Sequence, residues 1–411
     1  MVRREGREAA QDSQSYYHWQ VRAAHVRGEA VTYYTKLGML LAGELDPAAA
    51  LLGEVADIRP ADTVLVLNSG TGLTGVVAAR LAASGHVHLA DGNALAVEAT
   101  RRTLAANGVT NATVYPSVGT AHLPGGLSAA VALIRLPKGR LPALQLLRDA
   151  FYAVQPGGRI YLAGGNDEGI KTYLGSLAEL CGEVKVVAYR RGHRVGVARR
   201  PPDGWALPDA FTDPWLEHGR YHRFAVAARG KTYTICSRPG IFSWDRLDPG
   251  SAALLETMQV QRGESVLDLG CGYGILGAVA AELVGPQGCV YLLDAEVCAV
   301  EAAQRTLEAN NITNAFVCLG DCAQPVEGMR FDVVVTNPPF HQGKGTTYDI
   351  ALQFVRDAAR LLRPGGRLYL VANRFIPYEE HVRAAFGAVK KPYEDAQFKV
   401  LSAVRADRSC A

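Results

Sequence analysis

The sequence predicts an α/β fold built from two tandem, doubly wound, Rossmann-like domains, of which the first is degenerate. Two observations lead to this prediction. Two long segments match at an offset of about 203 residues, which is the length of a whole domain. Within each copy, short β-branched runs alternate with Ala- and Leu-rich stretches at helical period. That alternation is typical of a parallel sheet covered by helices on both faces.

The internal repeat keeps both its order and its spacing. Thr63 to Leu81, TVLVLNSGTGLTGVVAARL, aligns with Ser265 to Leu283, SVLDLGCGYGILGAVAAEL. Each reads as an apolar strand, a glycine-rich turn and a helix. NGVTNATV from Asn107 matches NNITNAFV from Asn310, and PGGRIYLAGG from Pro156 matches PGGRLYLVAN from Pro364. At 411 residues the chain is long enough to form two cores.

Element positions follow from these patterns. We expect the strands of the second copy near residues 265–269, 289–293, 315–319, 331–335 and 367–372. The Pro-Gly-Gly turns at 156 and 364 are expected between a helix and the next strand, because proline cannot continue a helix. We predict a degenerate first domain over 1–185 that serves as a scaffold or in RNA binding, a basic aromatic linker over 186–220 and a catalytic domain over 221–411.

Composition restricts the class of protein. Hydrophobic residues make up 48% and charged residues 20% of the chain, as in globular proteins. There is no run of eighteen apolar residues, and the N-terminus starts with the charged MVRREGREAA, so we expect a cytoplasmic protein with no membrane association. The eight cysteines form no CxxC pair and have no histidines at zinc-ligand spacing. We therefore expect reduced thiols and no metal.

Positive charge is concentrated between the two copies. Residues 185–240 hold eleven Lys or Arg against four Asp or Glu, although the whole chain carries only +3. Aromatic residues are interleaved with these charges, and such a mixture can neutralise phosphates and stack on unpaired bases. Arg190 and Arg191 are our candidates for RNA contact in this segment; the alternative is a solvated linker. Part of it, RYHRFAVAARGKTYTICS, predicts a β-hairpin that turns at Arg229-Gly230.

A cofactor pocket is predicted at the strand ends of the second copy. Glycines after the first strand allow close approach of a ligand to the backbone, and GxGxxG is also satisfied, so a dinucleotide is a rival at this point. Asp294 ends the next strand, where a carboxylate can bind ribose hydroxyls. Asp268 suits the amino-acid portion of S-adenosylmethionine, and Asp321 suits the adenine amine, which favours that cofactor. The candidate cofactor-binding residues are Asp268, Gly270, Gly272, Gly274, Asp294, Asp321 and Asn337.

The most specific motif is Asn337-Pro338-Pro339-Phe340, which follows the strand FDVVVT. An amine conjugated to a ring is a poor nucleophile. The Asn337 side-chain oxygen and the Pro338 carbonyl can accept its two hydrogens and direct the nitrogen toward a methyl donor. The prolines stiffen the loop, and Phe340 can stack on an extruded base. Because it follows the motif, His341 is a candidate substrate contact, or else a packing residue.

The first copy lacks this chemistry. Val66 stands for Asp268, Asn68 for Gly270, and Leu136-Pro137-Lys138 for Asn337-Pro338-Pro339. Without a carboxylate or an amide acceptor we expect no methyl transfer there, whereas Gly70, Gly72 and Asp91 are retained and leave residual cofactor binding open.

These residues resemble the tandem-domain ribosomal RNA guanine-N2 methyltransferases, of the small-subunit (16S rRNA) type first and its large-subunit (23S rRNA) relative second. The resemblance covers nearly the whole chain and rests on PGIFSWDRLDPGSAALLE from Pro239, DLGCGYG, NPPFHQG and the degenerate first domain. It implies an active second domain, S-adenosylmethionine as methyl donor and N2-methylguanosine as product. We expect 16S rRNA within the small subunit as the partner, and we expect the protein to be a monomer. It also implies that Phe242 and Ser243 lie near the cofactor or substrate.

Other readings stay open. Adenine-N6 methyltransferases and release-factor glutamine methyltransferases also use a tetrapeptide of this kind to hold an amine, but theirs more often ends in Tyr. A non-catalytic RNA-binding or assembly factor with a retained pocket is a rival of another class. Intact Asp268, Asp294 and Asn337 favour an enzyme over it.

Overall fold

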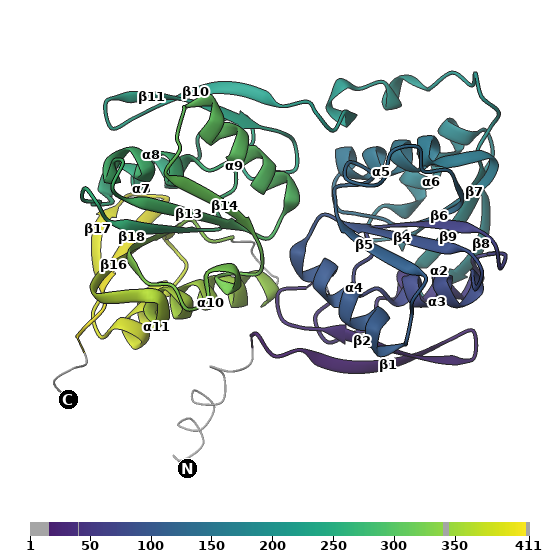
Figure 1. Cartoon of the computed structure of the whole chain (residues 1–411), viewed down its shortest axis with the longest axis horizontal. Coiled ribbons are helices and arrows are strands. Elements are labelled where there is room, and N and C mark those ends of the chain that lie inside the picture. Colours follow the sequence, from purple (N-terminus) through teal and green to yellow (C-terminus); the bar gives the residue numbers. More distant parts are fainter. Residues whose placement is uncertain (1–15, 40, 340–344, 408–411) are drawn as a thin grey trace, which may run out of the picture. The chain divides into compact units, whose positions relative to one another are not determined.

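The computed structural model describes residues 16–39, 41–339 and 345–407 and divides the chain into two compact units, 1–220 and 221–411. Figure 1 shows that each unit is a sheet with helices on both faces. This architecture confirms the predicted tandem of Rossmann-like units. Phe340 and His341 lie outside the described residues. None of the helices in the described ranges is long and apolar enough to cross a membrane.

The first unit contains a seven-stranded sheet in the order β5-β4-β3-β6-β7-β9-β8, preceded by a separate two-stranded hairpin. Strands β3 to β7 are parallel, whereas β9 runs antiparallel to β7 and β8 antiparallel to β9. Its strands are β1 (Gln20–Val26), β2 (Glu29–Thr35), β3 (Thr63–Leu67), β4 (His86–Asp91), β5 (Ala112–Pro116), β6 (Ala129–Arg135), β7 (Val154–Gly165), β8 (Lys185–Arg190) and β9 (His193–Arg199). Its helices are α2 (Pro47–Val55), α3 (Leu73–Leu81), α4 (Ala94–Ala106), α5 (Arg140–Ala153) and α6 (Ile170–Cys181), with 3-10 turns η2 (Asp209–Phe211) and η3 (Pro214–Leu216).

The second unit repeats this topology with the order β14-β13-β12-β15-β16-β18-β17. Its strands are β10 (His222–Ala228), β11 (Lys231–Ser237), β12 (Ser265–Leu269), β13 (Cys289–Asp294), β14 (Ala315–Leu319), β15 (Phe331–Thr336), β16 (Leu362–Asn373), β17 (Lys390–Glu394) and β18 (Phe398–Val404). Its helices are α7 (Pro249–Thr257), α8 (Ile275–Val284), α9 (Val297–Ala309), α10 (Gly345–Leu361) and α11 (Tyr378–Phe386), with the 3-10 turn η4 (Gln324–Val326). The five predicted strands of this copy are all present.

Parallel strands carry continuous apolar runs because both faces of each sheet are buried. In the first unit, one buried cluster packs α2, α3 and the β1–β2 hairpin on the sheet, and another packs α5 and α6 on it. In the second unit, the cluster around Val266, Val290 and Val333 joins α7 and α8 to the strands. These cores fix the strand ends at which the candidate site lies.

Two details correct the sequence predictions. Residues 186–199 are not linker, because β8 and β9 complete the first sheet. The Pro-Gly-Gly turns lie inside the first part of β7 and β16, since α5 ends at Ala153 and α10 at Leu361. A register shift occurs there in both sheets, so the turn makes an irregularity at the start of the strand.

A hairpin precedes each sheet, although only the second was predicted. The β10–β11 hairpin turns at Arg229-Gly230, and both residues have positive φ. The β1–β2 hairpin turns at Arg27-Gly28 in the same way. Arg229 donates to the carbonyls of Leu255 and Met258 at the end of α7, and Arg27 donates to the equivalent carbonyls of Gly53 and Ala56 at the end of α2. The repeat therefore starts near residue 20, earlier than its sequence suggested.

Candidate active site in the second unit

A glycine-rich turn joins β12 to α8. Gly270, Gly272 and Gly274 have φ of 73°, 55° and 83°, a region that L side chains rarely adopt. A Cβ on Gly272 would meet only Ile241, at 4.0 Å, whereas one on Gly274 would lie 3.0 Å from Ala303. Gly274 is thus required for packing against α9, and Gly272 leaves open space in front of the turn. This space is where a ligand can approach the backbone.

Asp294, at the end of β13, holds this turn. Its Oδ2 accepts a hydrogen bond from the Gly272 N–H at 2.9 Å, and its Oδ1 accepts one from the Glu296 N–H at 3.0 Å. Burial raises the pKa of this carboxyl, while the backbone N–H donors oppose that effect. Each carboxylate oxygen keeps a further lone pair, which fits the predicted role of receiving ribose hydroxyls.

Asp268 lies deeper than predicted. Its side chain is fully buried in β12, and its Oδ2 accepts from the Gly277 N–H in the first turn of α8 at 2.9 Å. Its Oδ1 is buried without a hydrogen-bond partner among the described residues. Burial raises the pKa of this carboxyl to about 7. Asp268 therefore ties the strand to the helix, and its second oxygen is an acceptor that an ammonium group of a ligand would satisfy.

Asp321 and the segment 238–247 border the same turn. Asp321 is buried after β14, where the Gly320 N–H donates to the Asp294 carbonyl at 2.9 Å. Tyr273 Oη donates to the Arg246 carbonyl, and this bond joins the turn to the segment. Within that segment Phe242 is 54% exposed and Ser243 adopts a left-handed φ of 50°. Sparsely populated backbone of this kind is often found at ligand sites.

Asn337 directly follows β15. Thr336 pairs with Leu269 in the parallel sheet, so Asn337 rises from the same edge as the glycine turn. Its Nδ2 donates to Asp248 Oδ2 at 3.0 Å and to Ser251 Oγ at 2.9 Å. No described residue donates to Oδ1. Since both amide hydrogens are engaged, the amide cannot rotate without losing two bonds, and its oxygen is fixed as an acceptor. Pro338 is buried and Pro339 half-buried.

Asp248 and Ser251 are site residues that sequence reasoning missed. Asp248 is the N-cap of α7 and also accepts from the Ser251 N–H at 2.8 Å. Both side chains are 7% exposed. An aspartate before Pro-Gly-Ser signals a helix start. Its contact with Asn337, 89 residues further along the chain, has no local signal.

The first unit has an ion-paired arginine at the position of Asn337. Leu67 pairs with Ile134 as Leu269 pairs with Thr336, so Arg135, and not Leu136, is the equivalent of Asn337. Arg135 is 7% exposed and binds Asp46, the N-cap of α2, and Glu168, each at 2.7 Å. The sequence alignment was wrong here by one residue. The expected loss of the amide acceptor holds, because a guanidinium only donates.

The cofactor turn of the first unit keeps its backbone geometry. Asp91 Oδ2 accepts from the Gly70 N–H at 2.9 Å, as Asp294 does from Gly272. Asn68 has a φ of 59° and donates to the Arg135 carbonyl. Burial raises the pKa of Asp91 to about 6. Arg190 and Arg191 also belong to this unit, on β8 and its turn. No group of three metal-ligating side chains is found among the described residues.

Comparison with known proteins places the chain. The model of the methyltransferase small domain family matches twice, over residues 30–196 and 232–402. The ribosomal RNA small subunit methyltransferase C of Hahella chejuensis is 34% identical over 270 residues, which are 66% of this chain and 76% of that protein. The protein of the same name from Pseudomonas aeruginosa is 34% identical over 67% of this chain and 79% of its own length. The chain belongs to this tandem-domain methyltransferase family.

A solved structure agrees with the two-unit fold. The 16S rRNA N2 G1207 methyltransferase of Thermus thermophilus, in complex with AdoMet and guanosine, has a TM-score of 0.77 and 30% identity. The match covers 94% of this chain and 98% of that chain. This chain thus carries two copies of the fold, as predicted, and that solved relative is in complex with the cofactor and the nucleoside that the sequence predicts.

Proposed function

We propose that the protein transfers a methyl group from S-adenosylmethionine to the exocyclic N2 of a guanine in 16S rRNA. The observation that carries this proposal is the fixed Asn337 amide, whose oxygen is presented as an acceptor by Asp248 and Ser251. The relatives named small-subunit methyltransferases and the solved structure with AdoMet and guanosine support the cofactor and the base.

The residues of the second unit fit the cofactor. When bound, S-adenosylmethionine supplies an electrophilic methyl group on a sulfonium. Asp294 would receive the ribose hydroxyls, Asp321 the adenine amine, and the buried free oxygen of Asp268 the amino-acid portion. Gly270, Gly272 and Gly274 leave room for the ligand beside the backbone.

Asn337 acts on the target amine. Its Oδ1 and the Pro338 carbonyl accept the two N2 hydrogens, which orients the nitrogen and stabilises the positive charge that develops on it. The nitrogen gains the methyl group as the carbon–sulfur bond breaks, and one amine proton then leaves to water. The proposed contacts to the base are Phe340, Phe242, Ser243 and His341. The residues named here for both ligands come from one unit, which supports a monomeric enzyme. We further propose that it acts on the small subunit in the cytoplasm and needs no metal.

Labelled S-adenosylmethionine tests the proposal. The protein is incubated separately with small subunits, large subunits, stripped rRNAs, DNA and release factor, and the labelled product is identified after digestion. N2-methylguanosine from small-subunit RNA is the expected product. Label in large-subunit RNA would move the activity to the 23S branch, and label in adenine or glutamine would contradict guanine chemistry. Cofactor binding without any transfer would favour a non-catalytic assembly factor.

A further inference from the structure

The β8–β9 hairpin of the first unit is strongly basic. Residues 184–202 contain six Lys or Arg and no Asp or Glu. Five of the six residues of β8 are exposed, and the sixth, Ala188, is half-buried. Arg190 and Arg191 are exposed at the turn, and among the described residues neither side chain forms a hydrogen bond or an ion pair. These two arginines are therefore available to a partner.

An aromatic side chain lies beside these charges. Tyr189 is 58% exposed, and the Arg194 guanidinium lies over its ring at 4.2 Å from the centroid. Arg191 adopts a left-handed φ of 47°, and Gly192 follows with 85°, so the turn is tight. A rigid turn with two arginines next to an exposed ring suits a phosphate backbone with nearby bases.

The turn lies at the ligand-binding edge of the first sheet. His193 pairs with Gly165 at the carboxyl end of β7, so the turn is at the edge where ligands bind in such folds. The Asn166 N–H donates to the Gly192 carbonyl at 2.8 Å, and Asn166 Oδ1 accepts from Arg194 at 3.2 Å. The loop after β7 thus holds the β8–β9 turn in place.

The degenerate catalytic position supports this loop. Glu168 binds the Arg135 guanidinium with both oxygens, at 2.7 and 2.8 Å, and also accepts from the Gly165 N–H at 2.7 Å. Contacts therefore run from Arg135 through Glu168 and residues 165–166 to the basic turn. Arg135, which stands where the second unit has the catalytic Asn337, is therefore the start of the contacts that reach the basic turn.

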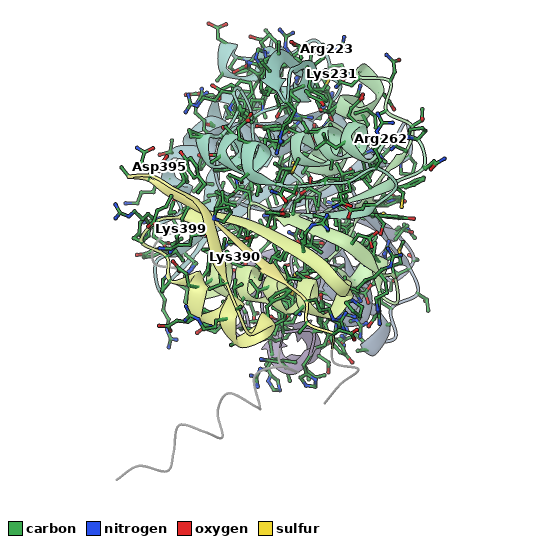
Figure 2. The ribbon with its side chains drawn as sticks, turned by 90° about the vertical axis from the view of Figure 1, so that its left-hand side faces the viewer. Arg223, Lys231, Arg262, Lys390, Asp395 and Lys399 are labelled. Carbon is green, nitrogen blue, oxygen red and sulfur yellow. The ribbon has the colours of Figure 1, made fainter. Side chains whose placement is uncertain are left out.

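The second copy of the fold supplies an internal comparison. Its equivalent hairpin, β17–β18, ends in Glu394 and Asp395, both exposed, and Figure 2 shows Asp395 at the end of that hairpin. Glu394 forms ion pairs with Lys391 and Arg374, so this turn has its partners within its own unit. Cations on an edge strand can simply prevent aggregation. Protection of an edge does not require opposite charges at the two turns, so the basic turn of the first unit points to a partner of its own.

We propose that the β8–β9 turn, through Arg190 and Arg191, binds the phosphate backbone of the RNA substrate, and that the Arg135–Glu168 pair braces it. This inference rests on the proposed function and adds to it a contact outside the catalytic unit. The first unit then serves as a substrate-binding module whose former catalytic position has become structural.

The test uses the full chain with Arg190→Gln and Arg191→Gln combined. Binding to deproteinised 16S rRNA is measured from ~50 to ~200 mM KCl. We expect the Kd at ~100 mM salt to rise on the order of 10- to 50-fold, and the slope of log K against log salt to fall by about two. The KM for small subunits should rise while kcat and the affinity for S-adenosylmethionine stay unchanged. Arg59→Gln with Arg101→Gln, two exposed arginines of the same unit, is the matched control.

The outcomes separate this inference from the proposed function. Wild-type Kd and salt slope in the double variant, with normal methyl transfer by the wild type, would overturn the inference alone. Aggregation with unchanged RNA affinity would show edge protection instead. Weaker binding to intact subunits but not to stripped RNA would indicate a protein partner and also overturn it. A wild type that binds RNA through the turn yet methylates nothing would overturn the proposed function only.

Glu168→Gln tests the brace. It removes the charge opposite Arg135 without changing the arginines of the turn. We expect faster amide hydrogen exchange at Asn166, whose N–H is bonded to Gly192, and a several-fold rise in the Kd for 16S rRNA. Unchanged exchange and affinity would leave the arginines as contacts but contradict the brace.

Discussion

Removing the carboxylate of Asp248 should slow methyl transfer by releasing the Asn337 amide. In Asp248→Ala the amide loses its bond to a charged acceptor, and such bonds contribute about 1.5–3 kcal/mol. If this energy orients the amide in the transition state, kcat falls roughly 10- to 150-fold, at about 1.4 kcal/mol per tenfold. Asp248→Asn keeps an oxygen at the same place and an equally good helix cap, so we expect only about a fivefold fall.

Single-turnover transfer to saturating small subunits measures this effect, and calorimetry measures the affinity for S-adenosylmethionine, which should not change. Asp46→Ala is the matched control, because Asp46 caps α2 in the first unit as Asp248 caps α7. It should lower stability by about 1 kcal/mol or more without changing kcat. Wild-type kcat in Asp248→Ala, or an affinity for the cofactor that falls in parallel with kcat, would refute the reasoning.

Three further predictions concern the glycine turn, a buried carboxyl and the degenerate site. Gly272→Ala should abolish cofactor binding and lower stability by about 1 kcal/mol. Gly70→Ala, at a similar φ and with nothing within 4 Å of its Cβ, should lower stability equally and leave cofactor binding intact. Calorimetry measures the binding, and thermal unfolding measures the stability. Because burial raises the pKa of Asp268 to about 7 in the folded state, its charged form opposes folding, and the free energy of unfolding falls as the pH rises from about 4 to about 7. In Asp268→Asn, urea unfolding across this pH range should show a flatter dependence of stability on pH. A dependence equal to that of the wild type would contradict the assignment. Arg135→Ala leaves the carboxylate of Glu168 without its cation and should destabilise the first unit by about 2–4 kcal/mol with cofactor affinity retained, and loss of that affinity would argue against separate units.

Much of the second unit was predictable because its strands are buried on both faces. The predicted strand at 265–269 matches β12, and glycines at positive φ mark the turn that follows. Alternation around Arg229-Gly230 predicted the β10–β11 hairpin. In these places local pattern and tertiary environment demand the same residues, so the sequence alone is sufficient.

Other features depend on contacts that no local pattern reports. Residues 186–199 were predicted as linker because they are rich in Arg, and β8 is an edge strand in which no residue is fully buried. Asp268 is held in its buried position by the hydrogen bond from the Gly277 N–H in α8. An aspartate near the end of a strand does not predict such a bond from the sequence. Asp248 was passed over because its capping role is local, while its role at Asn337 is formed across the sheet edge.

The two copies show how an active site can be lost while its framework stays. Asp46 caps α2 and Asp248 caps α7, and each binds the side chain at the equivalent position at the end of the fourth parallel strand, Arg135 or Asn337. The cap is needed for stability in either unit, whereas the residue it binds is free to change. With Asn337 the carboxylate fixes an acceptor toward substrate. With Arg135 the equivalent carboxylate, Asp46, joins an ion-pair network that occupies the position of the catalytic amide and is linked through Glu168 and residues 165–166 to the β8–β9 turn. A return to Asn at position 135 would thus restore neither the carboxylate missing at Val66 nor the open site, and we expect no methyl transfer from it.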